Sequence, residues 1–115
     1  MESILTSIKK MLGISEEDES FDTDVIIHIN SVLSDLVRLG VGPSSGFVIE
    51  DKYSEWTDFV PYEQFIKLSG LVTYVYMRVK LVFDPPTSAA VITSMKEQND
   101  KFEWELNVTA ESEVE

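Results

Sequence analysis

Cysteine is absent from this chain of 115 residues, and basic residues are scarce. The lack of cysteine excludes disulfides and thiolate metal sites, and it leaves the redox compartment undetermined. Lysine and arginine total 9, against 21 aspartates and glutamates, so the formal net charge is −12. Binding to a nucleic-acid backbone needs clustered cations, and this composition argues against it. The acidity has two interpretations: a surface that keeps the protein soluble, or a surface that repels or imitates DNA.

Long apolar runs are also missing, because polar or charged residues interrupt each of them well before about 18 positions. We therefore expect no transmembrane helix. The opening residues, Met1 to Ser3, do not fit the basic start of a signal peptide, and we expect the protein to be made and used in a cytoplasm. Hydrophobic residues make up 43% of the chain, enough for one core. We predict a single domain over residues 1–109 and an acidic tail over residues 110–115.

Two segments in the first forty residues have the apolar spacing of amphipathic helices. The first covers residues 3–12, and Gly13 is placed to stop it. The second covers residues 22–39, with Ser20 or Asp22 as its N-cap and Gly40 at the left-handed position after its end. Between them, the acidic segment 15–20 is predicted to be a solvated loop, because like charges so close together resist folding.

Residues 41–59 differ in character from the helices on either side. Gly42, Pro43 and Gly46 break any helix, and short β-prone runs then flank a polar turn at residues 50–52. This pattern predicts a short β-hairpin or an ordered loop. A lone hairpin is barely stable in water, so the segment needs a surface to pack on.

The segment after Pro61 predicts a helix over residues 62–83 that is apolar on nearly all sides. One face collects Phe65, Leu68, Val72, Val75, Val79, Val82 and Phe83. A second face collects Ile66, Gly70, Tyr74, Met77 and Leu81. Either the helix is central in the core, or its second face meets a neighbouring subunit with Gly70 as a notch for close approach.

The sequence Asp84-Pro85-Pro86 ends that helix, and a last helix follows to about Val108. Asp84 or Thr87 can cap it. Trp104 falls opposite the predicted core stripe and close to Val108, so it either contacts a partner or covers the edge of its own core. The predicted core stripe is Val91, Ile92, Met95, Phe102 and Leu106. The predicted fold is all-α, a small bundle of about four helices with the hairpin or ordered loop in the middle.

No group of residues has the pattern of a catalytic or metal site. His28, the one histidine, has Asp24 one turn away, a pair more typical of a helix surface than of a catalytic dyad. The acidic residues 18–24 fail the calcium-loop pattern, because Thr23 stands where glycine is needed and Ile29 where glutamate is needed. No glycine-rich phosphate loop is present. We predict that the chain is no enzyme and uses no cofactor.

Several stretches in order resemble the head–tail connector proteins of tailed bacteriophages, also described as head-completion or adaptor proteins. The resemblance covers roughly residues 3–107. Glu105 departs from the family pattern, which has a basic residue at that position. The stretches are Phe21 to Ser31, Leu39-Gly40-Val41-Gly42-Pro43, Trp56-Thr57-Asp58-Phe59, Val79 to Ser88 and Glu103-Trp104-Glu105-Leu106-Asn107.

This resemblance implies a structural virion protein that forms a ring, typically of twelve subunits, beneath the portal of the capsid. The ring extends the DNA channel, offers a platform for the stopper or tail-completion protein, and is assembled in the bacterial host cytoplasm. DNA passes through without specific binding, and no membrane or cofactor is involved. The second face of the 62–83 helix then becomes the candidate subunit contact. Candidates for axial contacts with other components are Phe47, Val48, Ile49, Tyr53, Trp56, Trp104 and Val108.

The alternative function is an acidic DNA mimic that inhibits a nucleic-acid-binding enzyme. Such a protein needs carboxylates at phosphate-like spacing on one face. Here the acidic residues are spread over the linker, the loop and the tail, which counts against this alternative.

Overall fold

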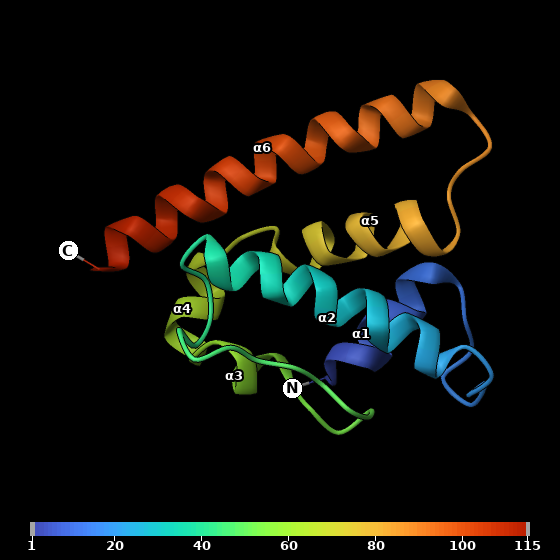
Figure 1. Ribbon diagram of the computed structural model, residues 1–115, viewed down its shortest axis with the longest axis horizontal. Coiled ribbons are helices and arrows are strands. Elements are labelled where there is room, and N and C mark those ends of the chain that lie inside the picture. Colours follow the sequence, from blue (N-terminus) through green and yellow to red (C-terminus); the bar gives the residue numbers. More distant parts are fainter. Residues whose placement is uncertain (1, 115) are drawn as a thin grey trace.

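The computed structural model describes the backbone of residues 2–114 and the side chains of residues 2–109. Within that part the chain forms helices and no strand, which confirms the all-α prediction. Helices α1, α2 and α5 pack against one another, and α6 packs along α5. Figure 1 shows α6 at one edge of the molecule and α1 and α3 toward the opposite edge. The bounds are α1 (Ile4–Leu12), α2 (Asp22–Arg38), α3 (Trp56–Phe59), α4 (Tyr62–Lys67), α5 (Leu71–Phe83) and α6 (Ala89–Val114).

Helix α1 lies where the sequence predicts it. The Ser3 Oγ accepts a hydrogen bond from the Thr6 N–H at 2.9 Å, and Gly13 ends the helix in a left-handed conformation. A helix this short is marginal alone, so it depends on docking. Three of its side chains supply that docking, because each is almost completely buried: Ile4, Leu5 and Ile8.

Helix α2 follows its predicted range, but neither predicted residue caps it. Phe21 takes the N-cap position and makes no side-chain cap. The Ser20 hydroxyl donates to Asp18, and the Asp22 carboxylate pairs with Lys9 Nζ at 2.8 Å. These partners hold the two predicted caps away from the free N–H groups of the helix. The predicted apolar stripe does face the core, with Val25, Ile29, Val32, Leu33 and Leu36 buried.

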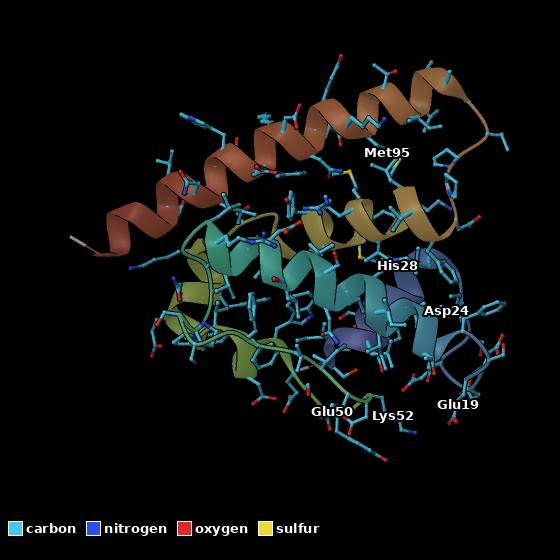
Figure 2. The ribbon with its side chains drawn as sticks, viewed as in Figure 1. Glu19, Asp24, His28, Glu50, Lys52 and Met95 are labelled. Carbon is cyan, nitrogen blue, oxygen red and sulfur yellow. The ribbon has the colours of Figure 1, made fainter. Side chains whose placement is uncertain are left out.

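The segment between α2 and α3 is an ordered loop and not a β-hairpin. Asn30 of α2 holds it: the Asn30 Oδ1 accepts from the Ile49 N–H at 2.8 Å, and its Nδ2 donates to the Ile49 carbonyl at 2.9 Å. These two bonds satisfy backbone groups that a second strand would otherwise pair. Ile49 is buried, whereas Figure 2 shows Glu50 and Lys52 at the outer edge of the loop. The loop therefore packs on α2 instead of pairing with itself.

The helix predicted over residues 62–83 is broken in two. Helix α4 ends at Lys67, and α5 begins at Leu71 after Gly70, whose φ is +91°. Glycine adopts this left-handed conformation without the steric cost that a side chain brings. Pro61 takes the N-cap of α4, just before the predicted first-turn position. The break changes which side chains of this segment share a face.

Helix α6 begins at Ala89, and Ser88 caps it in place of the predicted Asp84 or Thr87: the Val91 N–H donates to the Ser88 Oγ at 3.3 Å. The helix continues beyond the predicted end at Val108 to Val114. The side chains of the predicted acidic tail, residues 110–115, lie outside the described residues, so its division from the domain stays a prediction. Of the predicted stripe, Leu106 is buried, Ile92, Met95 and Phe102 are half-buried, and Val91 is exposed. Figure 2 shows Met95 pointing from α6 toward α5.

Candidate partner-binding surfaces

The five residues predicted as a subunit contact do not share one exposed face. Tyr74 and Met77 are buried within the chain, because the break at Gly70 and the packing of α5 between α2 and α6 cover this side of the helix. The core-helix interpretation therefore holds for these two residues. Ile66 is 60% exposed and Leu81 is half-buried, so both have surface that another subunit can reach.

The notch at Gly70 is filled by the chain itself. A Cβ atom at this position would lie 2.8 Å from the ring of Phe102 on α6, closer than real Cβ contacts allow. The sequence analysis assigned close approach at Gly70 to a neighbouring subunit, whereas the ring that lies there belongs to the chain's own last helix. Gly70 therefore positions α6 on the body of the protein.

The residues predicted as axial contacts divide into buried and exposed sets. Ile49 and Trp56 belong to the core, and the Trp56 Nε1 donates to the Ser7 Oγ at 2.8 Å. Phe47 is half-buried, with its ring centroid 5.3 Å from that of Phe59. The surface residues of the set are Val48 (64% exposed), Tyr53 (74%), Trp104 (68%) and Val108 (39%).

A polar network that the sequence analysis missed joins α2, α5 and α6. Arg78 donates to the Asp35 carboxylate at 2.6 Å and to the Tyr74 hydroxyl at 2.8 Å. The Tyr74 hydroxyl in turn donates to Glu103 of α6 at 3.1 Å. The i, i+4 spacing of Tyr74 and Arg78 was visible in the sequence, but nothing there indicated partners 43 and 29 residues away.

The network perturbs two pKa values. Burial raises the pKa of Tyr74, and the neighbouring Arg78 guanidinium only partly opposes this effect. For Arg78 burial favours the neutral form, but hydrogen bonds to Asp35 and Tyr74 outweigh it, so its pKa lies above the ordinary value. At neutral pH the pair therefore consists of a neutral phenol and a guanidinium that bonds to Asp35, a carboxylate that Arg38 also contacts at 2.7 Å.

Helix α6 has a second polar anchor near its middle. The Asn107 Nδ2 donates to the Leu39 carbonyl at the end of α2, at 2.9 Å. This bond satisfies one of the carbonyl groups that a helix end leaves free. Together with the Phe102 contact at Gly70 and the burial of Leu106, it fixes the segment 102–107 on the body.

The acidic loop 15–20 is exposed, as predicted, but a buried cation holds it in place. Lys9 Nζ donates to the carbonyl of Glu16 at 3.2 Å and to that of Asp18 at 2.7 Å, and it pairs with Asp22. The Lys9 side chain is 4% exposed. The loop backbone is therefore anchored, while its carboxylates point to solvent.

His28 is part of an aromatic contact. Its ring centroid lies 6.3 Å from that of Phe83, which also meets Phe21 edge-on at 5.7 Å. Within the described residues, no group of three or more His, Cys, Asp or Glu side chains could hold a metal ion. Nor is any described helix long and apolar enough to cross a membrane.

Comparison with protein families identifies a relationship that covers nearly the whole chain. A family model described as phage connector protein matches residues 4–113, nearly the whole chain. No curated protein and no solved structure matches the chain. The matched range includes every helix of the bundle from α1 into the last turn of α6. The chain thus belongs to the phage connector family, whose members are structural proteins of the head–tail junction of bacteriophages.

Proposed function

We propose that the chain is the repeating subunit of a ring, an adaptor or head-completion protein that docks under the phage portal. The observation that carries this proposal is the family match over residues 4–113. The ring extends the DNA channel and joins the head to the stopper or tail-completion protein. Its role is structural and non-catalytic, and it works in the virion after assembly in the host cytoplasm. A twelve-subunit ring is the expected stoichiometry.

Exposed apolar side chains on separate elements support this proposal. Ile66 on α4 and Leu81 on α5 are the remaining candidates for the subunit contact. Val48 and Tyr53 in the ordered loop and Trp104 on α6 are candidates for axial contacts. A ring needs two different patches per subunit, because head-to-tail contacts join unlike surfaces.

The net charge of −12 also fits a channel component. Carboxylates that line the channel repel the phosphate backbone, so DNA slides without adhering to the wall. Reversal of channel-lining carboxylates to lysine should therefore slow DNA ejection, and unchanged ejection would contradict this part of the proposal. No observation favours the DNA-mimic alternative.

Electron microscopy of the chain mixed with the portal of the same phage tests the ring directly. The expected result is a closed ring of density at the tail-facing end of the portal. Isolated subunits with no density at the portal would contradict the proposal. The Ile66→Glu variant should lose the ring, because it places a charge in the proposed contact. Ile27→Glu is the matched control, since Ile27 is also 60% exposed but lies outside that contact.

A further inference from the structure

A hollow of about 300 Å³ lies beside α6 and contains two carboxylates and an exposed indole. Leu39, at the end of α2, and Asn107 form its inner wall. Asp100, Glu103 and Trp104 complete it, and the Trp104 ring is largely open to solvent. Glu103 is held in place by the hydrogen bond from the Tyr74 hydroxyl. The hollow thus offers fixed negative charge next to an aromatic ring.

A second hollow adjoins the first across Asp100 and Glu103, which line both. Asn99 also lines this second hollow. The residue is only 6% exposed, and its Oδ1 accepts no hydrogen bond from any described residue. A buried carbonyl oxygen left unpaired is costly, so a donor that reaches it is favoured.

Three acceptors that line the two hollows have hydrogen-bonding capacity to spare. The Asn99 Oδ1 and the Asp100 carboxylate accept no hydrogen bond from the described residues, and the Glu103 carboxylate, which accepts one hydrogen bond from the Tyr74 hydroxyl, can accept more. Arg78, which also lines the second hollow, already donates to Tyr74 and to Asp35, a carboxylate that it shares with Arg38. Lys96 is exposed and can turn to solvent. A guanidinium or ammonium group supplies the donors that these acceptors lack, and its charge is attracted to the face of an indole ring.

We propose that these four residues, Asn99, Asp100, Glu103 and Trp104, form an acceptor site on α6 for an arginine or lysine side chain of another protein of the phage particle. The inference rests on the proposed function, because it identifies the chemistry by which the connector recognises a neighbouring component. An arginine fits best, since its planar fork can bond two carboxylates while it stacks on Trp104.

Net charge decides between the possible occupants. DNA and a second copy of this chain are both strongly anionic, and a copy carries 21 acidic residues against 9 basic ones. Both are repelled from a site that presents two carboxylates. A cationic segment of a different protein is attracted to the same two carboxylates. We therefore take such a segment as the occupant of the site.

Nuclear magnetic resonance of the indole N–H groups tests the chemistry of the site. The probe is the blocked peptide acetyl-Gly-Arg-Gly-amide, and its control is the same peptide with citrulline, which has a similar shape and no charge. The arginine peptide should shift the Trp104 resonance and leave that of the buried Trp56 in place. Asp100→Asn with Glu103→Gln should remove the shift. Equal shifts with both peptides, or none with arginine, would overturn the proposal.

Binding of the chain to the portal and to the next tail-side component tests the site in the particle. The same double variant should weaken one of these associations about tenfold, equivalent to about 1.4 kcal/mol. The matched control is Glu16→Gln with Glu19→Gln, which changes the net charge equally in a loop far from the site along the chain. If the wild type forms no ring with the portal, the proposed function fails. If it does and the double variant binds every component like the control, the acceptor site fails.

Discussion

Lys9 shows how one charged residue can organise a loop. Its ammonium group donates to two loop carbonyls and pairs with the Asp22 carboxylate, although its side chain is almost completely buried. Lys9→Met keeps the apolar stem but leaves these acceptors unpaired, so the free energy of unfolding should fall by about 3 kcal/mol. Urea denaturation of the variant and the wild type measures this difference in the free energy of unfolding. Lys10→Met, which removes the same charge from an exposed pair with Glu2, should change stability much less, and equal effects would contradict the structural role of Lys9.

Glycine can be required by its backbone conformation or by close packing, and a comparison of Gly70 with Gly46 distinguishes the two. Their φ angles are +91° and +98°, so alanine at either position is strained by about 1–2 kcal/mol. A Cβ at Gly70 also meets the Phe102 ring, whereas one at Gly46 meets nothing within 4 Å. Gly70→Ala should therefore cost about 1–3 kcal/mol more than Gly46→Ala. Thermal or urea unfolding of both variants gives the difference, and equal losses would mean that Phe102 moves aside freely.

Tyr74 gives the fold a pH dependence on the alkaline side. Burial raises its pKa in the folded chain above the ordinary value of 10.0. The folded state therefore holds the phenol proton at pH values where the unfolded state releases it, and stability falls as the pH rises above about 10. Urea unfolding between pH 8 and 11 should show a steeper decline for the wild type than for Tyr74→Phe. Parallel declines would show that the Tyr74 proton is not linked to folding.

At the scale of elements, the sequence identified the helices well and their interruptions poorly. The apolar spacing within α1 and α2 is local, so their ranges could be predicted. The break between α4 and α5 was not predicted, because Gly70 was placed inside one continuous helix and not recognised as the left-handed residue that separates two. For the same reason the predicted contact face included Tyr74 and Met77, which the body of the protein covers.

The middle segment takes the second of its two predicted forms, an ordered loop and not a hairpin. Short β-prone runs indicate extended backbone, but they do not identify the partners of its N–H and carbonyl groups. Here one side chain, Asn30, supplies both partners of Ile49. The exposure of Trp104 could be expected from the sequence, because it falls opposite the predicted core stripe of its helix, a signal that needs no tertiary contact.

The loop should therefore depend on Asn30 more than on its own sequence. Asn30→Ala leaves the Ile49 N–H and carbonyl without their partners in a buried place, which costs about 1–3 kcal/mol. Hydrogen exchange of residues 42–55 should accelerate more than exchange within α5. Ser31→Ala, one position along and exposed, is the control and should leave both rates unchanged. Loop exchange that matches the wild type in Asn30→Ala would show that other contacts hold the loop.

For the whole molecule, the excess of negative charge should make the monomer more stable in salt. A chain at −12 repels itself when compact, and the repulsion acts over distances that about 0.1 M salt screens, since the Debye length there is about 10 Å. The ion pair of Lys9 with Asp22 is close and largely shielded from solvent. Salt therefore weakens the attraction within this pair less than it weakens the long-range repulsion.

The midpoint of thermal unfolding should thus rise between about 0.01 and 0.15 M sodium chloride, a range over which the screening length falls several-fold. A variant with Glu16, Glu17 and Glu19 changed to Gln should start from a higher midpoint and respond less to salt, because it carries less excess charge. A midpoint that falls with salt would mean that attractive pairs outweigh the repulsion. In that case the excess of acidic residues would not lower the stability of the isolated subunit. Its presence would then need no explanation from a role in the assembled channel.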